Sequence, residues 1–229
     1  MKVLLVLLVL LLGAAVVADR VGEGIAEDRV ATEIAQRGGL TGTPEVDVTG
    51  FPFLTQALGG RYEDVRIALT AEQLGQPAGT AADVSLRGVH LPLGDALSGA
   101  VTEVPVDRVD GTATLSYALL AAQLGGDTTL AAEGGGVRVT RTVDVLGVRV
   151  PLTATGTVTL QGSDVVVDVA AAEASGVDVP DVVLDRASGL LDLRYPVPAL
   201  PFGLQLTGVR PSPDGVHVTV EATGTVLRG

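Results

Sequence analysis

The chain has 229 residues, of which 47% are hydrophobic and only 18% charged, and its acidic residues outnumber the basic ones by 27 to 15. The formal charge of −12 argues against a nucleic-acid-binding protein, because phosphate contacts need clustered cations. The chain contains no Cys, which excludes disulfides, thiolate metal sites and cysteine nucleophiles.

The N-terminus carries a single positive charge followed by an unbroken apolar segment. Lys2 precedes 16 apolar residues that end at Ala18, and Asp19 follows. A Leu/Val-rich centre with small residues before the first acid is typical of a cleaved secretory signal peptide. The alternative is a retained membrane anchor, although a spanning helix needs about 20 apolar residues. We interpret residues 1–18 as one of the two, with cleavage favoured, and expect an exported protein.

Residues 19–37 have the pattern of an amphipathic helix. Apolar residues recur at steps of three and four, with charged residues between them, and the pair Gly38-Gly39 ends the pattern. This helix and the preceding apolar segment are predicted to be nearly continuous.

Beyond Gly39 the period of the apolar residues changes to two, which predicts β-strands. The predicted strands cover residues 45–48, 62–69, 82–90, 101–115, 136–145, 148–160, 164–170, 204–209 and 216–226. Helical patches are predicted at 117–124 and 181–191, and short helical turns at 54–58 and 93–97. No linker rich in Pro or Ser separates these elements, so residues 19–229 are predicted to form a single α+β domain with long antiparallel strands.

The sequence offers little catalytic chemistry. The only histidines, His90 and His217, lie in predicted strands, and we interpret them as solvent-facing residues or cross-strand partners. No motif of a serine hydrolase, zinc peptidase or nucleotide-binding protein occurs. Two carboxylate groups lack the spacing of a calcium-binding loop and are interpreted as solvated charge: Glu103, Asp107 and Asp110, and Asp178, Asp181 and Asp185. An envelope glycosidase with two facing carboxylates is a further hypothesis, but no residue marks such a pair.

All three Phe of the chain lie in two short segments that also contain Pro and Gly. The segments are Gly50-Phe51-Pro52-Phe53-Leu54 and Leu200-Pro201-Phe202-Gly203-Leu204. One interpretation is an aromatic plug that closes the end of a sheet. The other is an apolar lip at the entrance to a cavity, and the two interpretations are compatible.

The block from Val48 to Gln56, continued by Gly60 to Val65, resembles the opening block of the LmeA-like phospholipid-binding proteins of actinobacteria. The N-terminal apolar segment with its helix, the second Phe segment, and Asp214-Gly215 before a final strand also resemble that family. The resemblance implies an exported protein of a periplasm-like cell-envelope space, soluble or anchored by its N-terminal apolar segment, that binds phospholipid and has no known catalytic residue. The fold that it implies is similar to tubular lipid-binding domains: a long N-terminal helix wrapped by a long, strongly curved antiparallel sheet, with an apolar cavity.

The resemblance therefore predicts a phospholipid ligand held between helix and sheet, possible lipid transfer, and neither a cofactor nor a metal. Abundant Gly would let strands bend, and Val, Leu and Ala would line an acyl-chain cavity. The alternative is a membrane-tethered structural or interaction β-domain of the cell envelope with a solid interior. A continuous apolar cavity would distinguish the two.

Six residues are the candidates for lipid contact: Phe51, Phe53, Leu54, Arg61, Pro201 and Phe202. Arg61 is the basic residue nearest the first Phe segment and is predicted to pair with a lipid phosphate. Loss of Lys2 with residues 1–18 would change the net charge from −12 to −13, so anionic lipid surfaces would repel the domain. Membrane contact is therefore expected to be apolar and local, through the first Phe segment.

Overall fold

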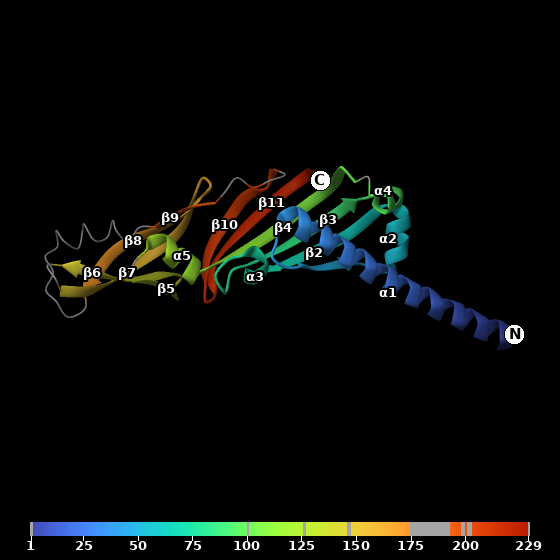
Figure 1. The fold of residues 1–229 in the computed structure, drawn as a ribbon, viewed down its shortest axis with the longest axis horizontal. Helices are drawn as coiled ribbons and strands as arrows, with labels where there is room; N and C mark the ends of the chain where they lie inside the picture. The colour runs from blue at the N-terminus through green and yellow to red at the C-terminus, as the bar shows by residue number, and fades with distance from the viewer. Residues whose placement is uncertain are drawn as a thin grey trace. The chain divides into compact units, whose positions relative to one another are not determined.

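The computed structural model describes residues 2–99, 101–125, 127–145, 148–174, 193–197, 200 and 203–228. These residues form an α+β fold with a long N-terminal helix and two antiparallel sheets, which confirms the predicted class (Figure 1). The helices are α1 (Lys2–Gly38), α2 (Phe53–Gly59), α3 (Ala71–Leu74), α4 (Leu93–Ser98) and α5 (Tyr117–Leu124). The predicted helical patch at 181–191 lies outside the described residues.

Eleven strands complete the described part of the fold. They are β1 (Glu45–Thr49), β2 (Arg61–Thr70), β3 (Ala81–His90), β4 (Glu103–Ser116), β5 (Thr128–Glu133), β6 (Gly136–Val145), β7 (Val148–Gln161), β8 (Asp164–Ala174), β9 (Leu193–Pro196), β10 (Gln205–Ser212) and β11 (Gly215–Arg228). One sheet has the order β1-β2-β3-β4-β11-β10 and the other the order β5-β6-β7-β8-β9, and neither closes on itself. Strong curvature, wrapping around the helix and an apolar cavity stay predictions.

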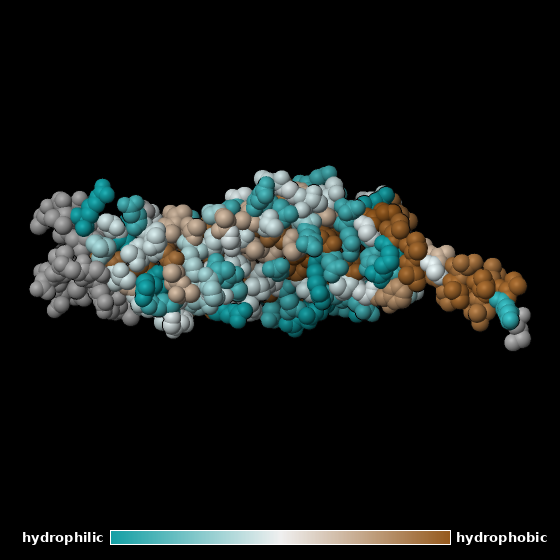
Figure 2. Space-filling model, turned by 90° about the horizontal axis from the view of Figure 1, so that it is seen from below, coloured by the Kyte–Doolittle hydropathy of each residue, from teal (hydrophilic) through white to brown (hydrophobic). Residues whose placement is uncertain are grey.

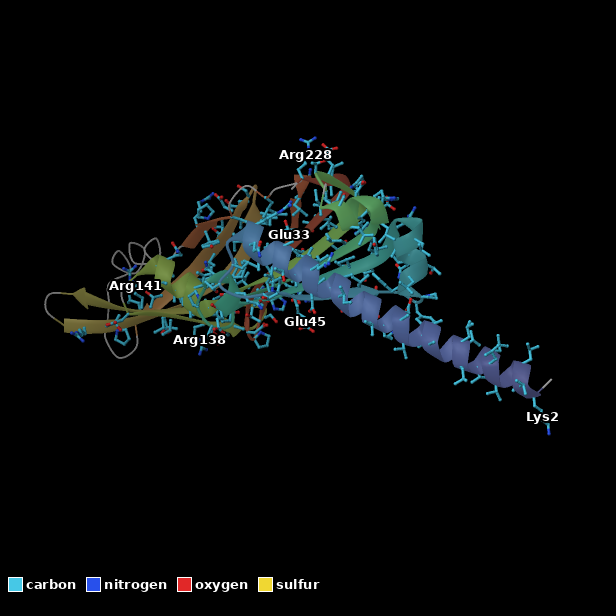
Figure 3. All side chains as sticks on the ribbon, turned by 45° about the vertical axis from the view of Figure 1, so that its right-hand side comes forward. Lys2, Glu33, Glu45, Arg138, Arg141 and Arg228 are labelled. Atoms are coloured by element: carbon cyan, nitrogen blue, oxygen red, sulfur yellow. The ribbon has the colours of Figure 1, made fainter. Side chains whose placement is uncertain are left out.

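Helix α1 runs without a break from Lys2 to Gly38, which confirms the predicted continuity. Its residues up to Ala18 are exposed, and it is long and apolar enough to cross a membrane, a property that a signal sequence shares. Burial begins abruptly at Asp19, which is 2% exposed. The helix therefore has a free apolar half and a half that belongs to the folded part of the chain, with Lys2 at its free end (Figure 3).

The chain divides into two compact units. The first comprises Met1–Leu69, Asp83–Asp110 and Ala222–Gly229, and the second Thr70–Ala82 and Gly111–Glu221. Strands β2, β3, β4 and β11 contribute residues to both. That the two units form one domain, as the sequence suggested, stays a prediction.

In the first unit, the second half of α1 lies across one face of the sheet (Figures 1 and 3). Ala31 is buried there, and the Glu27 carboxylate accepts a hydrogen bond of 2.8 Å from the N–H of Val48 in β1. Strand β1 pairs with β2 so that Val48 lies opposite Val65. This pairing continues the apolar face that α1 partly covers.

The second unit is held together by alternating side chains on its strands. Val137 and Val139 of β6 and Val165 and Val167 of β8 are fully buried, and Leu120 of α5 packs into the same cluster. The two-residue spacing is what a strand with one face in the core requires. This unit therefore has a closely packed core of its own.

Candidate functional site

The first Phe segment leads into α2, and a carboxylate of α1 caps the start of that helix. The first N–H groups of a helix lack partners within the helix, and Pro52 at the N-cap position has no side-chain acceptor. Asp19 supplies the acceptors instead. Its Oδ2 accepts from the N–H of Phe53 at 3.1 Å, and its Oδ1 accepts from the N–H of Leu54 at 2.8 Å. Since a negative charge is favourable at a helix N-terminus, Asp19 fastens the Phe segment to α1.

The charges in the first turn after the apolar segment are paired with one another. The Arg20 Nη1 atom lies 2.6 Å from Glu23 Oε2, and its Nη2 atom lies 3.5 Å from Asp19 Oδ2. The guanidinium carbon also lies 5.1 Å from the centroid of the Phe51 ring, within cation–π range. Both carboxylates are buried, so Arg20 is the charged group that reaches solvent at this point.

The residues of the first Phe segment differ in burial, and a cavity entrance lined by the exposed ones stays a prediction. Phe53 is 5% exposed, and its ring centroid lies 6.0 Å from that of Tyr62, so Phe53 is part of the core. Burial raises the pKa of the Tyr62 phenol. Phe51 and Leu54 are 63% and 38% exposed. A Cβ atom at Gly22 of α1 would lie 3.4 Å from Leu54 Cδ2, an ordinary van der Waals distance, so α1 and α2 pack against each other at this position.

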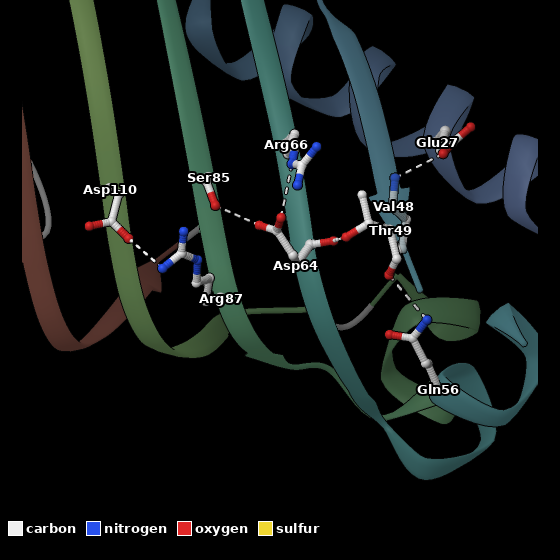
Figure 4. A network of polar contacts seen from close by, with 9 residues as sticks. All are labelled: Glu27, Val48, Thr49, Gln56, Asp64, Arg66, Ser85, Arg87 and Asp110. Carbon is white, nitrogen blue, oxygen red and sulfur yellow. Dashed lines mark hydrogen bonds and ion pairs between the residues drawn. The ribbon is translucent and has the colours of Figure 1, made fainter. Parts of the chain in front are cut away.

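A polar network covers one face of β2, β3 and β4 (Figure 4). The Asp64 carboxylate accepts hydrogen bonds from Arg66 Nε at 2.9 Å and from Ser85 Oγ at 2.5 Å. On the next strand pair, Arg87 Nη1 lies 3.5 Å from Asp110 Oδ2. These contacts place Asp64, Ser85 and their partners on the same, solvent-facing side of the sheet.

The opposite face of the same strands is apolar and only partly covered. Because side chains alternate along a strand, the neighbours of the networked residues point to the other side. Val65 on that side is 7% exposed, whereas Ile67, Leu69, Val84 and Leu86 are half-buried. The first unit therefore presents a row of aliphatic side chains that its own packing does not fully bury.

A family model described as LmeA-like phospholipid-binding matches residues 17–221. The chain belongs to the LmeA-like phospholipid-binding family. The matched range includes the docked half of α1 and parts of both compact units, and it confirms the resemblance carried by the first Phe segment. No curated protein and no solved structure matches the chain.

Membership of a phospholipid-binding family indicates which class of ligand the predicted contact residues would bind. Arg61 is exposed, and its Nη2 lies 2.7 Å from Asp107 Oδ2, while Asp107 Oδ1 lies 3.1 Å from His90 Nε2. A phosphate would have to displace this carboxylate, so the role of Arg61 stays a prediction. Pro201 and Phe202 lie outside the described residues.

The family is described by phospholipid binding and not by an enzymatic activity. Within the described ranges, no three His, Asp or Glu residues come together as a metal site would require. Arg108 donates hydrogen bonds to Asp110 and holds the pKa of that carboxyl below its usual value. His90 has the predicted cross-strand partner in Asp107, whereas His217 lies 3.0 Å from Asp214 in the adjoining turn. The Asp178, Asp181 and Asp185 group lies outside the described residues.

The second unit has an open hollow of about 440 Å³ between α5 and β5. Its lining is made mostly of small side chains: Tyr117, Ala118, Ala121, Ala122, Thr128, Thr129 and Leu130. The hollow borders the packed core of this unit, since Leu130 lines the hollow and also belongs to the core cluster.

Three residues with a clear place in this arrangement were not among the sequence candidates. They are Asp19, which caps α2, and Leu58 and Leu97, which are 77% and 68% exposed on α2 and α4. The sequence shows that a helix starting after Pro52 needs an acceptor from elsewhere, but it does not show that Asp19 supplies it. The two leucines carried no sequence signal, since their exposure depends on how the short helices dock.

Proposed function

We propose that this protein is exported to the cell envelope, binds phospholipid there without catalysing a reaction on it, and exchanges the lipid with a membrane. The acyl chains would lie against the apolar face of β2 and β3, partly beneath α1. The observation that carries the proposal is the row of half-buried side chains Ile67, Leu69, Val84 and Leu86. Family membership supports the lipid class, and the apolar half of α1 supports an envelope location.

The energetics favour exchange over tight storage. Removing a chain of about 16 carbons from water is worth about 12 kcal/mol at ~0.8 kcal/mol per CH₂. A phospholipid in a bilayer has already gained this free energy. A binding face as apolar as the bilayer interior therefore loads at little net cost, and the lipid can leave again.

Photolabelling tests this proposal on the full chain. We would reconstitute the protein in liposomes that contain a phospholipid with a diazirine near the end of one acyl chain, irradiate, and identify labelled peptides by mass spectrometry. Labelling of α1 is expected from the bilayer itself and serves as an internal standard. Lipid binding predicts additional label on peptides that contain Ile67–Leu69 and Val84–Leu86.

A pair of neighbouring substitutions sharpens the test. Leu86→Gln places an amide on the apolar face and should lower the labelling of β3 several-fold. Arg87→Gln, one residue further on the polar face, should leave the labelling unchanged. Label confined to α1 and α2 would reject lipid binding at this face and would favour the alternative, a membrane-tethered structural or interaction β-domain.

A further inference from the structure

The apolar part of α1 is shorter than the hydrocarbon core of a bilayer. The 16 residues from Val3 to Ala18 extend about 24 Å at 1.5 Å per residue. The hydrocarbon core is about 30 Å thick. If Lys2 lies at one interface, the other interface falls about four residues beyond Ala18, beside the first turn of the docked half of α1.

At that level the folded part of the chain exposes a group of large apolar side chains, which we call the collar. Phe51 precedes α2, Leu54 and Leu58 lie on α2, and Leu97 lies on α4, with exposures of 63%, 38%, 77% and 68%. The end of α2 and the start of α4 are joined by a hydrogen bond of 2.9 Å from the N–H of Leu91 to the carbonyl of Gly60. Figure 2 shows hydrophobic side chains along the free half of α1 and again where the helix reaches the folded unit.

The helix itself extends this apolar surface. Val21 and Ile25 on α1 are 56% and 53% exposed, although they lie beyond the apolar segment. Apolar side chains on three helices of one compact unit therefore lie near the same end of that unit.

The charges at this level are arranged so that they need not enter hydrocarbon. Asp19 is buried and accepts two backbone hydrogen bonds. Glu23 is buried and paired with Arg20, whose guanidinium lies over the ring of Phe51. A long cationic side chain of this kind can direct its charge to the headgroup layer while its stem lies along apolar surface.

The net charge of the chain makes an electrostatic approach to an anionic bilayer unfavourable, so contact has to be apolar. The collar adjoins α1, which is long and apolar enough to cross a membrane, so the bilayer is the partner that covers the collar. We propose that the collar residues lie in the interfacial layer of the membrane that α1 crosses: Phe51, Leu54, Leu58 and Leu97. They extend the apolar surface of the protein over the part of the hydrocarbon core that the apolar segment of α1 is too short to span. This proposal rests on the envelope location in the proposed function and on α1 being retained as a membrane anchor, but it does not require lipid binding by β2 and β3.

The absence of Cys makes depth measurements direct, because a single introduced thiol is the only one in the chain. Leu58→Cys and Leu97→Cys would each carry an environment-sensitive fluorophore in the full-length protein reconstituted in liposomes. Asp83→Cys, an exposed position on β3 of the same unit, is the matched control. All three positions are exposed, so substitution should not disturb the fold, and limited proteolysis would verify this.

If the collar lies in the interfacial layer, a phospholipid with a quencher near its headgroup should reduce the fluorescence at positions 58 and 97 at least several-fold more than at position 83. This location also predicts that iodide in the aqueous phase quenches position 83 but not the other two. Equal accessibility to iodide at all three positions would overturn the proposal. Protection from both quenchers would also overturn it, because a second copy of the chain would then cover the collar. Neither result depends on the labelling of β2 and β3, so the two proposals fail separately.

Discussion

Replacing Asp19 by Ala should loosen the start of α2 while the second compact unit stays intact. The carboxylate accepts the N–H groups of Phe53 and Leu54, and the first of these is buried. Hydrogen bonds to a charged acceptor contribute about 1.5–3 kcal/mol each, and capping side chains about 0.5–2 kcal/mol. Water can reach part of this helix end because Leu54 is 38% exposed, so we expect a total loss of about 2–3 kcal/mol.

Amide hydrogen exchange measures this loss at the place where it arises. A tenfold change corresponds to about 1.4 kcal/mol, so exchange of the Phe53 and Leu54 amides should accelerate about 30- to 150-fold. Asp28→Ala, which removes an exposed acid from the same helix, should leave both amides unchanged. Peptides of β6 and β8 should keep their protection in both variants. Wild-type exchange at the start of α2 in Asp19→Ala would refute the capping role.

Three further substitutions test the packing of the two units. Gly88 has a φ of +60°, and a side chain there would overlap a carboxylate of β4. Gly88→Ala should therefore lower the free energy of unfolding in urea by about 1–3 kcal/mol. The control Gly94→Ala should cost far less, because no atom lies within 4 Å of the new carbon. Similar midpoints for the two would contradict this account. Because burial raises the pKa of the Tyr62 phenol, the folded state keeps that proton at a pH where the unfolded chain loses it, and stability should fall as pH rises above about 10. Tyr62→Phe should reduce this alkaline loss in exchange measurements on the first unit; an undiminished loss would mean that the phenol is not responsible. Val167→Ala in the core of the second unit should lower the free energy of unfolding by about 2 kcal/mol. Val226→Ala, at a partly exposed position, should lower it by less than about 0.5 kcal/mol. Equal losses would argue against a packed core around Val167.

The sequence predicted the elements whose signals are local. Alternation over residues 164–170 identified β8, because one face of that strand lies in the core. It could not identify β5, in which Leu130 alone is buried and alanines are poor strand formers. Strand β5 forms because β6 lies beside it, and β9 is a four-residue strand that likewise depends on its partner β8.

The candidate site was predictable only as a segment. Proximity to Pro and Gly singled out Phe51 and Phe53, but which of them enters the core depends on the contact of α2 with α1. That contact uses Asp19, which is 34 residues from Phe53 in sequence. Short-range patterns cannot show a cap supplied over such a separation. The apolar face of β2 and β3 is a further example, since its exposure depends on how much of the sheet α1 covers.

The unbroken course of α1 has a consequence for how the protein would work at a membrane. A domain on a flexible linker samples many orientations, and its effective concentration at the surface is spread over all of them. Here the segment beyond Ala18 continues as the docked helix without a hinge, and Asp19 fixes α2 to it within one residue. The tilt of one helix in the bilayer would therefore set the direction in which the apolar face of β2 and β3 points. An inserted glycine or proline pair after Ala18 would free the domain to rotate while leaving every other contact in place.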